Sequence, residues 1–531
     1  MDSIIYKDEI LKLKDGVELL ARIWLPTYQE GPWPALLMRQ PYGREIGSTV
    51  TYPHPSWWAN KGYLVIVQDV RGQGGSGGEF KGFQQEAFDT TETHKWVRSL
   101  PECNGLLGTY GFSYQGFTQL IAKEGTKPPD CLAPAMTGVN EYDHWSCEGG
   151  AYWWDIGISW GLQLAALKAK RKKEWSVWEE IRESIEDGSY IRKGPLLLEK
   201  YDPQGMAYEW LSLSREPSAI WREHKPLKSW LSQPMLLIAG WWDPHLRGII
   251  DIYNKSITAG GNPEIHIGPA THLNWWEGTE LILLDFFNRN LKSNKNKGSY
   301  KNTPRKMIWN LTRKKWEKRY EQKKDGKFWG LSSGLCTSIT SEDNKLIQNI
   351  TGEGVAVIVN DPWRPVPSIG GHLSLNAGLV DRQNIDKRND VITFTSNPLK
   401  ERIRLAGMPT LEIKTKSENE SFDICLALSI LDKARKSVKQ ISTGFLRVRD
   451  NKSNTVIKRK INFQAILADL QKEECLRISI AGSAWPAIGI NPGCVSANCG
   501  PSSPYCHVIT IEVDLFDSKF QIIPVLKNKS T

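Results

Sequence analysis

The stretch Gly111-Phe112-Ser113-Tyr114-Gln115-Gly116 places a small hydroxyl side chain between two glycines. The residues before it, Leu106 to Tyr110, predict a short buried strand, and those after it, Phe117 to Ala122, are compatible with a helix. A sharp strand-to-helix turn exposes the serine oxygen and needs glycines, because a Cβ would clash where the two elements cross. The general pattern is G-x-S-x-G, whereas here Gln115 fills the place of the second glycine and Gly116 follows it. The hexapeptide alone is therefore also compatible with an ordinary glycine-flanked turn.

Strand-like and helix-like segments alternate on both sides of this turn. A hairpin is predicted at Asp15-Gly16, where two alternating runs meet. The predicted buried strands are Ala35 to Arg39, Tyr63 to Asp69, Leu132 to Thr137, Met235 to Trp241 and Glu264 to Ile267. The predicted helices are Glu86 to Arg98, Arg247 to Thr258 and Glu277 to Leu291. This alternation predicts an α/β fold with a mostly parallel sheet.

Two further regions follow different patterns. Between residues 146 and 230 helix-forming stretches replace the strands, and tryptophan is frequent, so we interpret this region as an inserted helical cap that supplies an aromatic substrate pocket. After residue 306 short alternating segments separated by turn residues predict a β-sandwich of jelly-roll type. The predicted domains are therefore a core formed by residues 1–145 and 231–300, a cap at 146–230 and a β-sandwich at 301–531.

Composition and charge argue against nucleic acid and membranes as binding partners. The formal charge is +9, but residues 291–327 hold 14 Lys and Arg against three acidic residues, so the remainder is close to neutral. This basic stretch lacks a nucleic-acid-binding motif and is typical of a solvated segment between domains. The first residues do not resemble a signal peptide and no run of 18 apolar residues occurs. We expect a cytoplasmic protein that binds neither nucleic acid nor membranes; a homo-oligomer is compatible with the sequence.

The cysteines do not indicate a disulfide framework. Their number, nine, is odd, and they are scattered along the chain, which favours free thiols. Cys494, Cys499, Cys506 and His507 lie close in sequence and are candidates for a zinc site, but their spacing matches no standard ligand pattern. We interpret them as loop and strand residues, and we expect no metal and no cofactor.

A serine nucleophile needs a base, and nine histidines can supply it. His272 lies in the loop Gly268-Pro269-Ala270-Thr271-His272, directly after a predicted strand, where an active-site loop of an open sheet belongs. His245 is the rival base, although its closeness to the candidate acid makes it a neighbour on the same loop. The other histidines are predicted to lie inside a strand (His266), in the first half of the core or the cap (His54, His94, His144, His224), or in the β-sandwich (His372, His507).

The acid is expected between the serine and the base, in the chain order Ser…Asp…His. Asp243 closes the predicted strand Leu236 to Asp243, so its carboxylate should emerge at the carboxyl edge of the sheet. Two oxyanion donors are needed as well. We predict the backbone N–H of Tyr114 as one donor and the hydroxyl of Tyr42, in the loop after the strand at 35–39, as the other. Pro41, beside it, has no N–H to offer.

With these residues in position, the chain resembles the cocaine esterase and X-prolyl dipeptidyl-peptidase group of serine hydrolases over nearly its whole length. The elbow is similar to that family's G-x-S-Y-x-G, in which the displaced glycine is expected. Pro41-Tyr42 resembles the family's oxyanion loop, and Gly240 to Asp243 and Gly268 to His272 resemble its acid and base loops. Segments 69–78, 361–367 and 481–486 are similar to further family landmarks. The resemblance implies an α/β-hydrolase core, a helical cap and a C-terminal jelly roll that buttresses the core without performing chemistry.

Two departures limit what the resemblance implies. The family's G-P-W-x-H reads Gly268-Pro269-Ala270-Thr271-His272 here, and the cap shows no motif for a particular substrate. The expected activity is hydrolysis of a small carboxylic ester or amide through an acyl-enzyme, with Ser113, His272 and Asp243 as catalytic residues. An X-prolyl dipeptidyl peptidase is the first alternative. It must capture a free α-amino group, for which the candidate carboxylates are Glu141, Asp143, Glu148 and Asp155. A non-catalytic jelly-roll binder of carbohydrates or surfaces is the second alternative.

Overall fold

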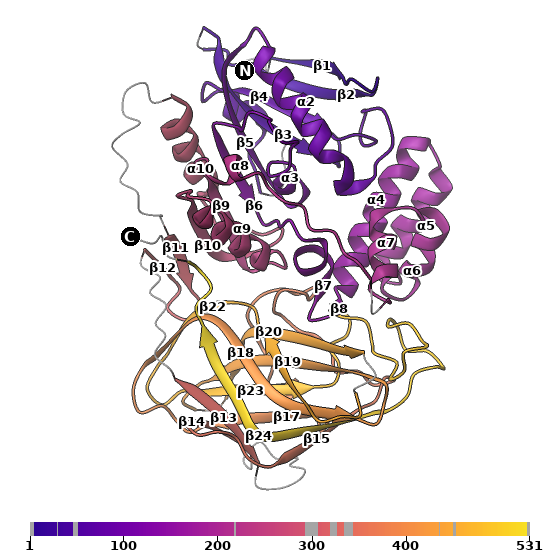
Figure 1. Ribbon diagram of the computed structural model, residues 1–531, viewed down its shortest axis with the longest axis vertical. Coiled ribbons are helices and arrows are strands. Elements are labelled where there is room, and N and C mark those ends of the chain that lie inside the picture. The colour runs from indigo at the N-terminus through magenta and orange to yellow at the C-terminus, as the bar shows by residue number, and fades with distance from the viewer. Residues whose placement is uncertain are drawn as a thin grey trace.

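The computed structural model describes residues 5–28, 30–45, 51–216, 219–292, 306–318, 327–333, 344–434, 436–449 and 453–527. An α/β domain with helices packed around a sheet lies above an all-β domain along the long axis of the molecule (Figure 1). A group of helices from the predicted cap lies beside the α/β domain, close to the junction with the all-β domain. The predicted fold class, an α/β-hydrolase core followed by a β-sandwich, is confirmed.

The α/β domain is built on one ten-stranded sheet with the order β1-β2-β4-β3-β5-β6-β9-β10-β11-β12. The strands from β4 to β11 run parallel, and β1, β2 and β12 add antiparallel edges. The strand bounds are β1 Tyr6–Lys12, β2 Glu18–Trp24, β3 Trp33–Gln40, β4 Leu64–Asp69, β5 Cys103–Phe112, β6 Cys131–Ala135, β9 Leu236–Trp242, β10 Glu264–Thr271, β11 Lys306–Asn310 and β12 Lys315–Glu317. The sheet thus includes β11 and β12, which lie beyond residue 300, the predicted end of the core.

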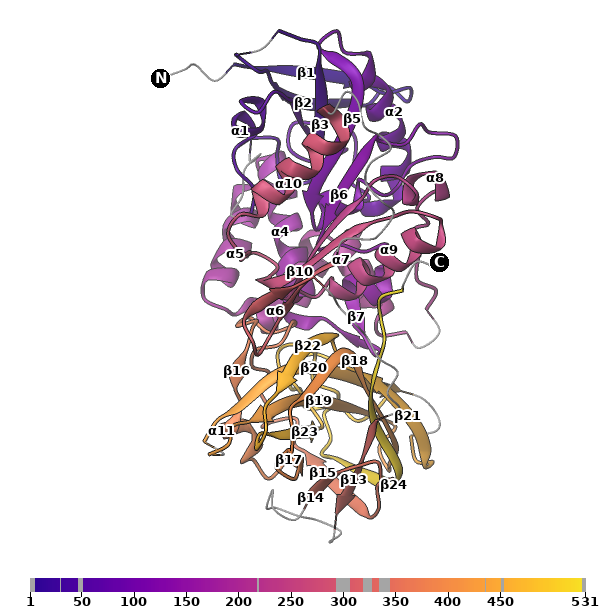
Figure 2. The same ribbon diagram turned by 90° about the vertical axis from the view of Figure 1, so that its left-hand side faces the viewer.

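Alternate residues of the central strands bury opposite faces of this sheet. Leu36 and Val65 pack with Trp58 and Phe287, whereas the next residue of β3, Leu37, packs with Val97 on the other face. The helices of this domain are α1 Pro55–Ala59, α2 Glu86–Ser99, α3 Tyr114–Phe117, α8 Lys228–Leu231, α9 Leu246–Thr258 and α10 Thr279–Phe287, which continues as a π-helical turn to Lys292. Helices α1 and α10 cover one face, as Figure 2 shows. Because both faces of this sheet are covered, its central strands contain continuous apolar runs.

The cap region begins with a short hairpin that the sequence did not predict, and then becomes helical as expected. The hairpin strands are β7 Cys147–Glu148 and β8 Ala151–Tyr152, and the helices are α4 Trp154–Lys172, α5 Trp175–Glu186, α6 Tyr190–Tyr201 and α7 Met206–Leu213. Buried side chains of α4, α6 and α7 belong to a hydrophobic cluster that extends from α9 into the β-sandwich. The cap is therefore packed against both domains.

The C-terminal domain is a β-sandwich whose strands follow the order β16-β20-β19-β23-β17-β14-β13-β24-β18-β21, with β15 paired to β24 and β22 to β18. The bounds are β13 Phe328–Ser333, β14 Asn344–Gln348, β15 Val355–Asn360, β16 Val380–Asp381, β17 Val391–Ser396, β18 Ile403–Ser417, β19 Ser421–Leu431, β20 Val438–Arg449, β21 Ile457–Asn462, β22 Ile466–Leu470, β23 Cys475–Ala481 and β24 Ile509–Ile523, with one short helix, α11 Gln383–Asp386. The segment after β24 runs back to α9, where the Lys527 N–H donates to the Asn254 side chain at 2.8 Å (Figure 2).

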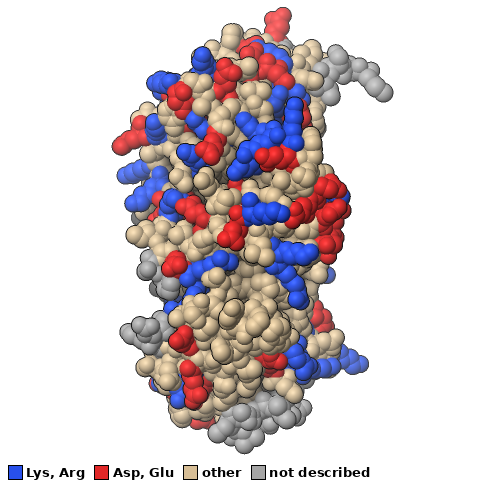
Figure 3. Space-filling view, turned by 90° about the vertical axis from the view of Figure 1, so that its right-hand side faces the viewer, with Lys and Arg blue, Asp and Glu red and all other residues tan. Residues whose placement is uncertain are grey.

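The surface carries mixed charge on the face shown in Figure 3. Lysine and arginine side chains are interspersed with acidic ones over the upper part of the molecule, and the face of the lower domain is largely uncharged. Among the described residues, no helix combines the length and the apolar character that a membrane crossing requires.

One predicted element is much shorter than expected. The helix after the serine ends at Phe117, because Gln119 and Leu120 switch to bonds with the carbonyls three residues back. The side chain of Thr118 also bonds the Gln115 carbonyl at 3.0 Å, which competes with the regular helical pattern. The apolar run from Phe117 to Ala122 is therefore buried as an irregular segment and not as a longer helix.

Candidate active site

Ser113 occupies a strained turn between β5 and α3. Its backbone has φ 58° and ψ −128°, outside the regions that L-residues ordinarily adopt, and its side chain is largely buried. A Cβ on Gly116 would lie 2.8 Å from the Ala135 carbonyl oxygen, and one on Gly111 would lie 2.4 Å from the Cβ of Gln115. Both glycines are therefore required by the close crossing of β5, β6 and α3, as the sequence predicted for such a turn.

Gln115, the residue in place of the generic second glycine, links the turn to the loop after β3. Its side-chain oxygen accepts from the Phe112 N–H at 3.3 Å, and its amide group donates to Gln40 at 3.0 Å. Gln40 in turn donates to the Gly43 carbonyl at 2.9 Å. These bonds hold the loop that carries Tyr42 next to the serine. The sequence pattern does not reveal this linking role of Gln115 and Gln40.

Asp243 and His272 form a direct pair at the carboxyl ends of neighbouring strands. Asp243 follows β9, His272 follows β10, and Nδ1 of the histidine lies 2.6 Å from Oδ2 of the aspartate. Burial by itself would raise the pKa of Asp243, but the charge and hydrogen bond of His272, together with the His245 N–H, outweigh it and hold the pKa below its usual value. Asp243 is fully buried and ionised, so it accepts the hydrogen bond from Nδ1–H of His272. In the neutral imidazole the lone pair is then on Nε2.

His245, the rival base, is directed elsewhere. Its backbone N–H donates to Asp243 at 2.8 Å, but its ring Nδ1 donates to the backbone carbonyl of His144 at 2.7 Å. Burial lowers the pKa of this imidazole to about 4, so the ring is neutral near pH 7. The aspartate side chain thus bonds the ring of His272 and only the backbone of His245. The histidine rings lie 5.1 Å apart, which makes His245 a neighbour on the same loop, as the sequence indicated.

The Tyr42 hydroxyl lies within hydrogen-bonding reach of Ser113 and receives a hydrogen bond from the cap. The indole N–H of Trp160, in α4, donates to the Tyr42 oxygen at 3.2 Å, and a side-chain hydrogen bond joins Tyr42 with Ser113. Burial raises the pKa of the Tyr42 phenol to about 12, against a smaller opposing effect of these two hydrogen bonds. The phenol therefore keeps its proton near neutral pH and remains a donor.

Tyr114 begins α3, so its backbone N–H belongs to the first turn, whose donors have no acceptor inside the helix. Its side chain is held by a buried hydrogen-bond network with Glu86 and Arg39. The hydroxyl donates to Glu86 at 2.8 Å, and Arg39 donates to the other Glu86 oxygen at 2.7 Å, with both ionisable groups buried. A signal for this network was present in the sequence, because Arg39 ends an apolar buried strand and a buried charge requires a partner.

Aromatic side chains of the cap, together with Trp145 just before it, gather beside Tyr42 and His245. The ring of Trp145 lies 4.4 Å from that of His245 and 5.8 Å from that of Trp160, and Trp210 lies 5.7 Å from Trp160. The tryptophan excess of the cap is therefore partly concentrated around the candidate site. The roles of Ser113, Asp243, His272, Tyr42 and Tyr114 remain predictions that their arrangement supports.

The carboxylates considered for capture of an amine have other partners. Glu141 is buried, accepts from Trp210 Nε1 at 2.7 Å and contacts His224 at 2.7 Å. Glu148 pairs with His372 at 2.5 Å, and Asp155 accepts from the Tyr190 hydroxyl at 2.6 Å. The fourth, Asp143, is partly exposed and lies 3.8 Å from an Arg247 nitrogen. Of the four, only Asp143 lacks a close, buried partner.

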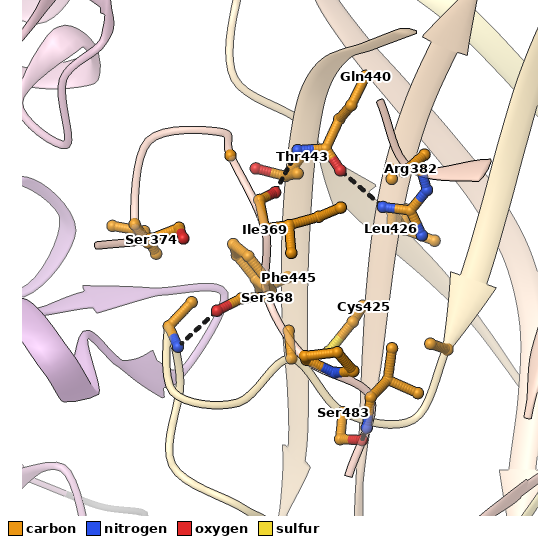
Figure 4. Close-up of a pocket in the computed structure, with 18 residues that line it drawn as sticks. Ser368, Ile369, Ser374, Arg382, Cys425, Leu426, Gln440, Thr443, Phe445 and Ser483 are labelled. Carbon is orange, nitrogen blue, oxygen red and sulfur yellow. Dashed lines mark hydrogen bonds between the residues drawn. The ribbon is translucent and has the colours of Figure 1, made fainter. Parts of the chain in front are cut away.

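Two other features lie away from this arrangement. Cys494 and Cys506 are partly exposed and Cys499 is buried, and all three are free thiols. A pocket in the C-terminal domain is bordered by the loop at 366–374 and by strands β19, β20 and β23 (Figure 4). The residues that line this pocket include none of the five predicted site residues.

Comparison with known proteins supports one family for the whole chain. The sequence model described as X-Pro dipeptidyl-peptidase (S15 family) matches residues 15–274. A second model, described as the X-Pro dipeptidyl-peptidase C-terminal non-catalytic domain, matches residues 301–519. The first match covers most of the α/β domain with its cap, and the second covers most of the β-sandwich together with β11 and β12 of the α/β sheet.

Relatives agree with these matches. Cocaine esterase of Rhodococcus sp. (strain MB1 Bresler) is 24% identical over an alignment of 445 residues, with 75% of this chain and 75% of that protein covered. An aminopeptidase from a marine sediment Thaumarchaeota archaeon has the same fold with a TM-score of 0.70 and 18% identity, over 98% of this chain and 96% of that one. A CocE/NonD family hydrolase from Staphylococcus aureus gives a TM-score of 0.71 and 16% identity, over 98% and 93% of the two chains. The chain therefore belongs to the hydrolase family that includes the S15 X-Pro dipeptidyl peptidases and cocaine esterase.

Proposed function

We propose that this protein is a serine hydrolase that cleaves a carboxylic ester or amide through an acyl-enzyme. The observation that carries the proposal is the 2.6 Å contact between His272 Nδ1 and the buried Asp243 carboxylate. This pair lies at the edge of the sheet where β5 delivers Ser113 in its strained turn. The order Ser…Asp…His at strand ends is the arrangement that α/β-hydrolases use for acyl transfer.

The first chemical step is acylation. Ser113 Oγ attacks the substrate carbonyl while Nε2 of His272 accepts the serine proton, and Asp243 stabilises the imidazolium through Nδ1–H. The oxygen of the tetrahedral intermediate receives hydrogen bonds from the Tyr42 hydroxyl and the Tyr114 N–H. His272 then protonates the leaving group. In the second step a water molecule, deprotonated by His272, attacks the acyl-enzyme and regenerates Ser113.

The surroundings of the site favour an apolar acyl group over a substrate with a free α-amino group. Trp145, Trp160 and Trp210 adjoin Tyr42 and offer apolar contact surface. Three of the four candidate carboxylates are buried and bonded to other side chains, so capturing an ammonium group would break an existing contact. This supports an esterase or acylase over an X-prolyl dipeptidyl peptidase.

A panel of p-nitrophenyl esters tests the proposal. We expect the wild-type protein to hydrolyse aliphatic or aromatic members and to react covalently with a fluorophosphonate probe. Ser113→Ala should abolish both, because the acyl-enzyme cannot form. Ester hydrolysis that persists in Ser113→Ala would show that the mechanism is wrong.

A chromogenic amide distinguishes the family's two activities. Glycyl-prolyl-p-nitroanilide carries the free amine and the proline that a dipeptidyl peptidase requires. We expect it to be cleaved at least about 100-fold less efficiently than the best ester, because no unpaired buried carboxylate among the four candidates receives its amine. A ratio of 100 corresponds to about 2.7 kcal/mol in free energy. Efficient cleavage that depends on Ser113 and is lost in Asp143→Asn would assign the peptidase activity instead.

A further inference from the structure

The acid loop of the α/β domain is bonded directly by a side chain of the C-terminal domain. Nε2 of Gln464 donates to the backbone carbonyl oxygen of Asp243 at 2.9 Å, across 221 residues of sequence. Both side chains are buried. A carbonyl oxygen only accepts hydrogen bonds, so the amide nitrogen of Gln464 must face Asp243.

Gln464 is itself fixed by strand β20. Its backbone N–H donates to the Thr443 carbonyl at 2.9 Å, and its own carbonyl accepts from the Ser442 hydroxyl at 2.7 Å. Thr443 also contacts His372 at 3.3 Å, and His372 pairs with Glu148 of the cap region at 2.5 Å. The segment that presents Gln464 is therefore anchored on both sides of the domain boundary.

The bond from Gln464 is one of several hydrogen bonds that constrain Asp243. The carboxylate of Asp243 holds His272 Nδ1 through Oδ2 and the His245 N–H through Oδ1, and Gln464 holds the carbonyl of the same residue. Asp243 lies just past the end of β9, where the ladder with β10 has already shifted register between Gly268 and Thr271. Regular sheet bonding thus does not fix the acid. Two longer turn bonds, from the Asp243 N–H to the Gly240 carbonyl and from the Leu246 N–H to the Asp243 carbonyl, both at 3.3 Å, are supplemented by the shorter bond from Gln464.

We propose that Gln464 is a positioning residue for the catalytic acid, supplied by the domain whose family description is non-catalytic. It touches neither substrate nor reacting atoms. Its amide keeps the Asp243 peptide in the orientation that aims Oδ2 at His272. The proposal rests on the function assigned to Asp243 and His272 above, and it predicts that the C-terminal domain affects turnover through one hydrogen bond.

Gln464→Met tests the proposal, because methionine keeps the length and volume of the side chain but cannot donate. We expect kcat for the best ester to fall by about ten- to a hundredfold, in line with the cost of about 1 Å of misplacement in a catalytic group. KM should stay within about twofold, because substrate contacts are untouched. Gln464→Asn, which keeps an amide on a shorter stem, should show the same loss if the methionine variant does not fold.

Gln440→Met is the matched control. Gln440 is equally buried in the same domain, and its amide donates to the Ile369 carbonyl at 2.7 Å, but it lies in the pocket of Figure 4 and has no bond to the acid loop. We expect this variant to lose thermal stability at least as much as Gln464→Met, since Arg382 also loses a partner. Its kcat should remain within about twofold of wild type. An equal fall in kcat for both variants would mean that general loosening of the domain is responsible.

A double-mutant cycle with Asp243→Asn separates this proposal from the function on which it rests. If Gln464 acts through the acid, Gln464→Met should lower the residual kcat of Asp243→Asn by less than about twofold. A further loss as large as in the wild-type background overturns the positioning role. If Asp243→Asn itself leaves kcat unchanged, the proposed triad is wrong; if it lowers kcat and Gln464→Met does not, only the positioning role is wrong.

Discussion

The direction of the hydrogen bond between Trp160 and Tyr42 leaves the Tyr42 hydroxyl able to donate to the proposed oxyanion. An indole N–H can only donate, so the Tyr42 oxygen accepts from Trp160 and its own proton stays available. Tyr42 is also hydrogen-bonded to Ser113, beside which a tetrahedral intermediate would develop its charge. Because burial raises the pKa of this phenol to about 12, the donor persists across the physiological range.

Tyr42→Phe should therefore lower kcat by about 10²- to 10³-fold with little change in KM, the usual cost of losing one oxyanion donor. Tyr110→Phe is a matched control, because its hydroxyl is buried in β5 and has no hydrogen-bond partner among the described residues. Steady-state kinetics of both variants on one ester provide the comparison. A similar kcat for the two variants would remove Tyr42 from the oxyanion hole.

Strand β5 contains two glycines with positive φ, and they serve different purposes. Gly105 (φ 88°) lies in open space, whereas Gly111 (φ 135°) lies against Gln115, the residue that links the turn to the Tyr42 loop. A side chain at either position strains the backbone, but only one at Gly111 also displaces a neighbour. Substitutions at Gly105 and Gly111 can therefore distinguish the free-energy cost of backbone strain alone from the added cost of crowding against Gln115.

Gly105→Ala should destabilise the protein by about 1–2 kcal/mol, the cost of a left-handed conformation for an L-residue. Gly111→Ala should cost about 1–3 kcal/mol more, because crowding adds to the same strain. It should also reduce turnover, since Gln115 must move. Urea unfolding and ester hydrolysis measure the two effects. Equal stability and full activity in both variants would contradict the steric account of the turn.

The elements that the sequence predicted well are those whose signal is local. The parallel strands and the β-sandwich follow from periodicity, and the α/β core and the β-sandwich are confirmed, although the α/β sheet extends through β12 to Glu317. Ser113, Asp243 and His272 were placed from their positions at strand ends, and their roles stay predictions. The helix after Ser113 was predicted too long, because the bonds made by Thr118, Gln119 and Leu120 do not appear in an apolar pattern. Trp160 and Gln464 were missed because their contacts span 118 and 221 residues and exist only after domains pack.

At the scale of the whole molecule, a buried pair joins the cap region to the C-terminal domain. Glu148 and His372 lie 2.5 Å apart, and the second oxygen of Glu148 is buried with no partner among the described residues. Burial alone would raise the pKa of Glu148, but the charge and hydrogen bond of His372, with a smaller contribution from Arg247, hold it below its ordinary 4.5. A carboxyl group with a depressed pKa stabilises the folded state above its unfolded pKa and loses that effect in acid.

Glu148→Gln should therefore cost about 3 kcal/mol of unfolding free energy at pH 7, as expected for a broken buried pair. The difference from wild type should shrink as the pH falls below 4.5, because the wild-type carboxylate then becomes protonated as well. Denaturant unfolding between pH 7 and pH 3 measures this. Glu223→Gln, which breaks the surface pair with Lys255, should cost at most about 1 kcal/mol. A pH-independent difference for Glu148→Gln would contradict a charged interdomain pair.

The bond between Gln464 and Asp243 also has a consequence for biosynthesis. Domains fold as units, N-terminal first, while the ribosome is still adding residues. The nascent α/β domain can therefore assemble its sheet, serine turn and histidine loop long before Gln464 is translated, 221 residues after Asp243. If Gln464 positions the acid as proposed, the growing chain lacks this bond until then, and we expect it to turn over substrate more slowly than the complete protein. Full turnover is then expected only after the β-sandwich has docked on the α/β domain.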